Sequence, residues 1–284
     1  MPSDLLSLCL LGRMPALPGT WMSAWSLAPA LVLPLLAWLV AALRRPSSRG
    51  VASAVLPTVA GRPLWIAGWC LLVVALVSPL CRLAATLVSG HMAQLLVLSV
   101  AAPLLLAIGG SAPACRDARP SGTGLATATL AYAAVLWLRH LPAVYDAALT
   151  LPWVHVAVVV LVVAGSLWFW QTILQAGRVG AGGTGRALLA LVATTGHTGL
   201  LGALLTFAPT PFYPLQAGGA TGWGLSPLED QQLAGMLMWV PGSLAYLATG
   251  VALVLRQVRA GDRTAEHAAL ASKRHWPTAQ GATD

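Results

Sequence analysis

The sequence predicts an all-α, polytopic membrane protein, a bundle of seven transmembrane helices with its N-terminus outside and its C-terminus inside the cell. Hydrophobic residues make up 57% of the 284-residue chain and charged residues only 8%, whereas about a quarter of the residues in a soluble domain are charged. The apolar residues also fall into long runs, and a run of about 20 residues crosses a hydrocarbon core of about 30 Å.

The predicted spans are separated by short stretches rich in glycine, proline and serine, which are typical of turns. They lie near 26–43, 64–80, 84–109, 124–141, 152–175, 187–208 and 231–255. No interval between two spans is long enough for a soluble domain. We therefore divide the chain into an extracytoplasmic segment 1–25, a membrane domain 26–255 and a cytoplasmic tail 256–284. The tail is expected to be a frayed helix end followed by disorder.

The basic residues predict the orientation, because the cytoplasmic ends of membrane spans carry an excess of lysine and arginine. Only Arg13, Arg82 and Arg139 fall on the predicted outer side. The inner side holds Arg44, Arg45, Arg49, Arg62, Arg116, Arg119, Arg178, Arg186, Arg256, Arg259, Arg263, Lys273 and Arg274. The formal net charge of +8 thus reflects membrane orientation. No basic and aromatic stripe of the kind that binds nucleic acid is present.

The four cysteines, Cys9, Cys70, Cys81 and Cys115, are scattered and form no CxxC pair. They fall at different depths of the predicted helices. We expect them to behave as small apolar residues, and predict neither a disulfide framework nor a zinc site.

A candidate site lies where the last apolar segment opens, in the stretch WGLSPLEDQQLAGMLMW at 223–239. Asp230 stands at the mouth of a run without charge until Arg256, and Met236 and Met238 follow one to two turns further in. Polar groups at this depth are costly unless they face a partner, a cavity or an ion. A plain helix N-cap is the alternative role for Asp230.

Four histidines offer partners on the predicted outer side. His91 lies a turn or two inside the outer end of its helix and is followed by Met92, and His155 opens its own helix. His197 lies near the middle of a span, where an ionisable residue is functional by default. His140 precedes Pro142, and we expect a surface or structural role for it. Imidazole, thioether and carboxylate together suit copper, and methionine favours Cu(I).

The segments resemble the polytopic bacterial cytochrome c oxidase assembly factor family, the CtaG-type membrane proteins. The matching pieces are SPL at 78–80, HMAQLL at 91–96, APLLLAIG at 102–109, HLPAVYDAAL at 140–149, WVHV at 153–156, LWFW at 167–170, GHTGLLGALLTFAPTPFYP at 196–214 and WGLSPLEDQQLAGMLMWVPGSLAYL at 223–247. The family commonly has a second histidine four residues after the first. Leu95 occupies that position here, which removes half of an HxxxH pair.

The resemblance implies a bacterial inner-membrane protein that helps to build a haem-copper cytochrome c oxidase, and no enzyme. We expect it to hold or deliver copper at the outer face, with oxidase subunits or a copper chaperone and membrane lipid as partners. In this hypothesis His91 and His197 bind Cu(I) with a methionine from the last helix, and Asp230 tunes or gates the site. A copper permease, a haem-binding oxidoreductase with axial His91 and His155, and a metal-free scaffold are the alternatives.

Overall fold

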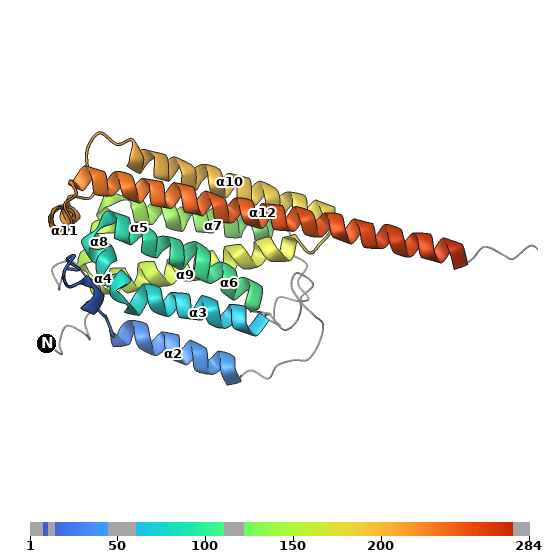
Figure 1. Cartoon of the computed structure of the whole chain (residues 1–284), viewed down its shortest axis with the longest axis horizontal. Helices are drawn as coiled ribbons and strands as arrows, with labels where there is room; N and C mark the ends of the chain where they lie inside the picture. The colour runs from blue at the N-terminus through green and yellow to red at the C-terminus, as the bar shows by residue number, and fades with distance from the viewer. Residues whose placement is uncertain (1–7, 11–14, 45–60, 111–121, 275–284) are drawn as a thin grey trace, which may run out of the picture.

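The computed structural model describes residues 8–10, 15–44, 61–110 and 122–274, and these ranges contain helices and no strand (Figure 1). The helices are η1 (Trp21–Ser23), α2 (Pro29–Arg44), α3 (Gly61–Val77), α4 (Pro79–Thr86), α5 (Val88–Leu96), the π-helix η2 (Val97–Ala101), α6 (Ala102–Gly109), α7 (Gly122–His140), α8 (Pro142–Thr150), α9 (Pro152–Ala176), α10 (Ala181–Thr206), η4 (Pro214–Gln216), α11 (Ala217–Gly222) and α12 (Pro227–Arg274). The all-α prediction is confirmed.

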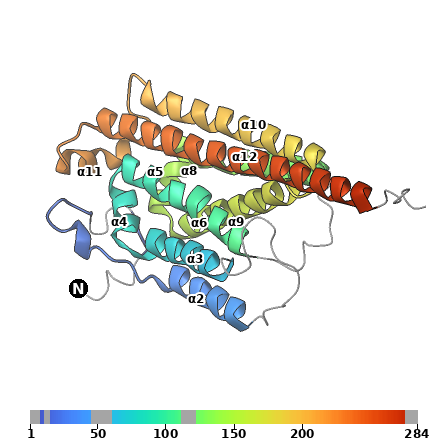
Figure 2. The same ribbon diagram turned by 45° about the vertical axis from the view of Figure 1, so that its right-hand side comes forward.

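The long helices run side by side as one bundle (Figures 1 and 2). Helix α10 packs along α12, α3 packs against α6, and α7 packs against α9. Helix α2 lies at one edge of the bundle beside α3, and the pair α10 and α12 forms the opposite edge (Figure 2). The α5–η2–α6 span lies between these edges, which places its buried residues in the apolar core.

Each of the seven predicted spans overlaps one or more helices, but fewer helices are long and apolar enough to cross a membrane. Four helices of the described ranges are long and apolar enough to cross a membrane by themselves. A fifth span results if α3 and α4, which meet at an angle of 51°, count as one. Helix α2 is a shorter apolar helix. The bundle is therefore a membrane protein with four to five candidate spans, and the count of seven and the orientation stay predictions.

The bend between α3 and α4 follows from Ser78 and Pro79. The Ser78 hydroxyl accepts a hydrogen bond from the backbone N–H of Leu80 at 3.2 Å, and Pro79 occupies the first helical position, so a new helix starts here. Helix α4 ends at Leu87, whose backbone is extended, and α5 begins at Val88. The predicted span at 84–109 therefore starts later than expected, because α4 is a separate helix.

Helices η1, α4, α8 and α11 gather at one end of the bundle, where the N-terminal segment also lies (Figure 1). We call this the α4 end. The N-terminal segment is fixed there, since the backbone N–H of Ala16 donates to Thr86 Oγ1 at 2.9 Å and the Trp223 indole donates to the Ala16 carbonyl at 2.7 Å. Residues about 200 positions apart in the sequence thus build this end.

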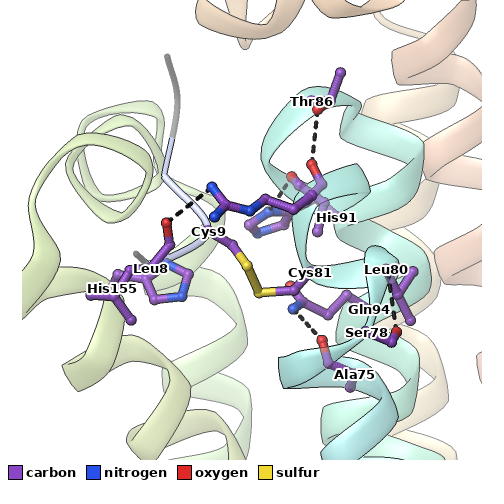
Figure 3. Close-up of a disulfide and its surroundings, with 12 residues drawn as sticks. Leu8, Cys9, Ala75, Ser78, Leu80, Cys81, Thr86, His91, Gln94 and His155 are labelled. Atoms are coloured by element: carbon purple, nitrogen blue, oxygen red, sulfur yellow. Dashed lines mark hydrogen bonds between the residues drawn. A yellow bond between two sulfur atoms is a disulfide. The ribbon is translucent and has the colours of Figure 1, made fainter. Parts of the chain in front are cut away.

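Cys9 and Cys81 form a disulfide with a Cα–Cα distance of 5.7 Å (Figure 3), so the expectation of unpaired cysteines was wrong for these two. They lie 72 residues apart, and the N-terminal segment brings them together by folding back onto α4. Cys70 is free and exposed. Cys115 lies outside the described residues.

Helix α12 continues to Arg274 and extends past the rest of the bundle (Figure 1). The sequence predicted a frayed helix end from residue 256, so the helix is longer than expected. Residues 275–284 of the predicted tail lie outside the described ranges.

Candidate functional site

Asp230 is 1% exposed, and both oxygens of its carboxylate accept hydrogen bonds from the start of α5. One oxygen accepts from the backbone N–H of Val88 at 2.7 Å. The other accepts from the backbone N–H of Ser89 at 3.1 Å and from the Ser89 hydroxyl at 2.5 Å. The first N–H groups of a helix have no partner within that helix. Asp230 of α12 therefore caps α5, and its negative charge lies at the positive end of the α5 dipole.

The N-cap of α12 is Ser226, so the alternative role of Asp230 as the N-cap of its own helix is wrong. The Ser226 hydroxyl accepts from the N–H of Glu229 at 3.2 Å, and the Glu229 carboxylate accepts from the N–H of Ser226 at 2.7 Å. This reciprocal pair is a capping box. Gln231 has a structural role as well, because its amide bonds Phe212 N–H and the Leu205 carbonyl and so fixes the loop after α10.

His91 is held in one tautomer by two neighbours. Its Nδ1 lies 3.2 Å from the carbonyl oxygen of Ala84, which only accepts, and its Nε2 is hydrogen-bonded to Nη2 of Arg139, which only donates. Nδ1 therefore carries the proton, and Nε2 presents its lone pair to Arg139. His91 is buried on the first turn of α5, so this arrangement is fixed by α4 on one side and α7 on the other.

His140 and His155 repeat half of that pattern. Nδ1 of His140 lies 2.6 Å from the carbonyl of Leu136, and Nδ1 of His155 lies 3.2 Å from the carbonyl of Ala148. Both side chains are buried, and Nε2 of each has no hydrogen-bond partner in the described part of the chain. Of the surface or structural role expected for His140, the surface alternative is wrong, because the side chain is buried.

These three histidines and Arg139 form one electrostatic group, since a positive charge on Arg139, His140 or His155 would disfavour a charge on His91. Arg139 is itself buried, and its Nε and Nη1 have no hydrogen-bond partner among the described residues. We call His91, Arg139, His140 and His155 the histidine cluster. It lies at the α4 end, where α4, α5, α7, α8 and α9 meet.

Two tyrosines and an amide line the histidine cluster. Tyr145 stacks on Tyr213 with ring centroids 3.9 Å apart and lies 4.6 Å from the ring of His91. Its hydroxyl donates to Oε1 of Gln216 at 2.5 Å, and Nε2 of Gln216 donates to the Ala84 carbonyl at 2.9 Å. This chain of bonds joins α8, η4 and α4 around His91.

Tyr213 lies in the loop after α10, and its hydroxyl donates to the carbonyl of His140 at 2.8 Å. Burial raises the pKa of Tyr213 to about 12. The phenol therefore keeps its proton at neutral pH and remains a hydrogen-bond donor. It fixes the backbone of His140 and does not serve as an acid or base.

His197 is half-buried on α10, and neither of its ring nitrogens has a hydrogen-bond partner in the described chain. Neighbouring threonines do not bond it, because Thr194 and Thr198 donate to carbonyls of their own helix. The structure thus gives His197 no partner from the histidine cluster.

The three candidate methionines lie in different surroundings. Met92 is fully buried in the apolar core. Met236 is 46% exposed on the surface of α12. Met238 lines a cavity of about 10 Å³ together with Ser99, Tyr132 and Tyr246, near the π-helix η2. The three methionines therefore lie in three different environments of the described chain.

No set of three or more histidine, cysteine or carboxylate side chains within the described ranges is arranged to hold a metal ion. The donor chemistry is nevertheless suitable for copper at the histidine cluster. Metal-bound histidines characteristically donate their second ring nitrogen to a carbonyl or carboxylate, which fixes the tautomer. His140 and His155 have this second bond and an unpartnered Nε2.

Arg139, Tyr145, Tyr213 and Gln216 belong to the site, although sequence reasoning did not select them. Arg139 was counted only as a basic residue at the outer side. The sequence held two signals for these residues. Arg139 directly precedes His140, and tyrosines occur in the segments HLPAVYDAAL and FYP.

The bundle and its cluster define an all-helical membrane protein with a buried, polar, histidine-rich site at one end. The family model described as cytochrome c oxidase caa3 assembly factor (Caa3_CtaG) matches residues 34–260, and the chain belongs to this family. The matched range contains the whole histidine cluster and Asp230. No curated protein and no solved structure matches the chain.

Proposed function

We propose that this protein assists assembly of a haem-copper cytochrome c oxidase by holding copper at the α4 end of its bundle and passing it on. Membership in the assembly factor family supports the process. The copper step is supported by the donor set at the histidine cluster. A haem-copper oxidase subunit or a copper chaperone would be the partner, and the bacterial inner membrane would be the location.

The observation that carries the copper proposal is the shared geometry of His140 and His155. Each ring donates Nδ1–H to a backbone carbonyl and leaves Nε2 without a partner. A buried nitrogen that lacks a hydrogen bond is unfavourable, and imidazole is a good copper ligand. We therefore assign copper first to His140 and His155. His91 would join after exchanging Arg139 for the ion.

An ion that must be handed on does not need a closed set of ligands. A complete tetrahedral site holds its ion permanently, as structural zinc sites do. The lack of a preformed group of three ligands among the described residues is compatible with transient holding. The proposed role of Asp230 as a tuning group is replaced here by its role as the cap of α5.

The disulfide supports the proposed orientation. Disulfides form and persist in oxidising compartments outside the cytoplasm, and Cys9–Cys81 lies at the α4 end. This end would therefore face outward, in agreement with the excess of basic residues on the other side of the predicted spans. Copper held here would be on the outer side of the membrane.

Cu(I) titration of the purified, oxidised protein tests the proposal. We expect His140→Ala and His155→Ala each to weaken binding at least tenfold, and the double variant to abolish it. His197→Ala should leave binding unchanged. Thermal unfolding of each variant shows whether the bundle is intact. Loss of binding in His197→Ala alone would place the ion on α10 and would refute the assignment to the histidine cluster.

A further inference from the structure

The Cys9–Cys81 disulfide lies against the histidine cluster and has no part in the function proposed above. Both cysteines are buried, and with Ala85 they form a small apolar cluster apart from the main core. Cys81 lies on α4, whereas Cys9 lies in the segment Leu8–Leu10, which belongs to no helix. The disulfide thus joins a helix to a non-helical segment.

His155 lies in the immediate surroundings of this disulfide, and Figure 3 shows its imidazole beside the Leu8–Cys9 backbone. The side chain is 8% exposed, its Nδ1 is bonded to the Ala148 carbonyl, and its Nε2 has no partner. A buried nitrogen donor therefore lies in the surroundings of the disulfide. Its protonated nitrogen is already bonded, so the other one is available for a metal ion.

A positive charge accompanies the cysteine pair. Arg82 directly follows Cys81, and its Nη1 lies 3.4 Å from the carbonyl of Leu8, which directly precedes Cys9. A neighbouring guanidinium favours the thiolate form of a cysteine, and the thiolate is the form that binds metals. The surroundings would therefore stabilise the reduced pair as a ligand.

We propose that Cys9 and Cys81 form a redox-dependent Cu(I) site, a disulfide in the oxidised protein and, once reduced, a pair of thiolates that binds one Cu(I) together with Nε2 of His155. The proposal rests on the copper function proposed above and adds to it a condition for loading. Thiolate sulfur is a soft ligand that selects Cu(I), and imidazole completes the set.

The redox step is balanced by thiol–disulfide exchange. A dithiol reductant supplies two electrons and two protons, the Cys9–Cys81 bond breaks, and the reductant leaves as its own disulfide. Copper binding then releases the two thiol protons. Exchange with a protein disulfide, which accepts two electrons and two protons and leaves as a dithiol, reforms the Cys9–Cys81 bond, removes both thiolates and so releases the ion.

The distance between Cys9 and Cys81 permits both the disulfide and a pair of thiolates bound to one ion. Two thiolates bound to one metal at about 2.3 Å each place their sulfur atoms within about 4 Å of one another. The Cα–Cα distance of 5.7 Å between Cys9 and Cys81 is compatible with that separation. The adjustment falls on the Leu8–Leu10 segment, which no helical hydrogen bonds restrain.

Anaerobic Cu(I) titration of the full chain, in the oxidised and the reduced state, tests the site. A Cys70→Ser/Cys115→Ser background removes the other two cysteines. We expect the reduced protein to bind its Cu(I) at least tenfold more tightly than the oxidised protein, and with sulfur ligands in its X-ray absorption spectrum. Nε2 of His155 can bind only one ion, so it leaves the ion shared with His140 for the one held by the thiolates. Equal binding in the two states would refute the proposal, and this comparison needs no change to the pair itself.

Variants then assign the ligands. Cys81→Ser and Cys9→Ser should each lose the tighter, sulfur-bound Cu(I), and His155→Gln should bind it about tenfold more weakly. Cys70→Ser alone should behave like the wild type. Retention of the sulfur-bound copper in Cys81→Ser, or a preference of the reduced protein for Zn²⁺ over Cu(I), would overturn the assignment.

The two proposals fail in different ways. If the thiol site is wrong but the function is right, the Cys9→Ser/Cys81→Ser protein still restores copper to the oxidase in cells that lack the wild-type protein. If the function is wrong, the oxidase keeps its copper in the deletion strain, whatever the reduced protein binds in solution.

Discussion

Asp230 of α12 holds Ser89 of α5 through both the backbone N–H and the hydroxyl of that serine, at 3.1 and 2.5 Å. The same carboxylate also accepts from the N–H of Val88 at 2.7 Å. These three bonds fix the start of the helix that carries His91. The position of His91 at the cluster therefore depends on a residue 139 positions further along the chain.

Replacing Asp230 should destabilise the bundle. Hydrogen bonds to a charged group contribute about 1.5–3 kcal/mol each, so we expect Asp230→Ala to lower the free energy of unfolding by on the order of 3 kcal/mol. Asp230→Asn keeps an acceptor and should lose about half of that. Gln232→Ala, at a half-exposed neighbour, is the control. Thermal unfolding in detergent measures all three, and an unchanged midpoint for Asp230→Ala would contradict the capping role.

Close packing of α10 on α12 depends on two glycines. A Cβ on Gly235 would lie 2.6 Å from the carbonyl oxygen of Gly202. This oxygen belongs to the backbone of α10, so it cannot move aside as the end of a flexible side chain could. Gly235→Ala should therefore destabilise the protein by about 1–3 kcal/mol. Gly196→Ala, where a Cβ meets nothing within 4 Å, should stabilise it by about 0.5–1 kcal/mol. Unfolding midpoints that shift in the same direction would show that the packing is looser than described.

Arg139 should compete with copper for His91. Arg139→Met removes the donor to Nε2 of His91 and a buried charge, so we expect Cu(I) binding by the oxidised protein to tighten about tenfold. Arg139→Lys keeps the charge and a donor and serves as the matched control. A weaker affinity in Arg139→Met, measured by competition with a chromogenic chelator, would mean that Arg139 supports the site and does not block it.

Orientation can be measured with reporters at two positions. A reporter fused after Asp284 should be active only as a cytoplasmic type. A reporter inserted at Gly224, an exposed residue with positive φ between α11 and α12, should report the outer side. The reverse result at either position would place the disulfide and the histidine cluster on the cytoplasmic side.

The sequence predicted the helices well because apolar runs and turn residues are local signals. Each predicted span overlaps at least one helix, and one helix ends at His140 before the next begins at Pro142. The bend after Ser78 was missed, although SP is a helix-start signal, because the apolar run continues through it. The number of true spans depends on how short helices such as α2 meet the membrane.

The site was predicted less completely, because its partners come from distant parts of the chain. The sequence indicated that Asp230 needs a partner, but only the packing of α12 on α5 identifies Val88 and Ser89. The pairing of Cys9 with Cys81 similarly requires the N-terminal segment to fold back onto α4. His140 is likewise held by a distant residue, because the hydroxyl of Tyr213 donates to its backbone carbonyl.

The copper content of the oxidase, purified from cells grown under limiting copper, tests the central claim most directly. In a strain that lacks this protein we expect the oxidase to contain less copper and to lose activity, while electron transfer upstream of it is unchanged. The wild-type gene should restore both properties, and the His140→Ala/His155→Ala variant should restore neither. An oxidase with its full copper content in the deletion strain would contradict the account.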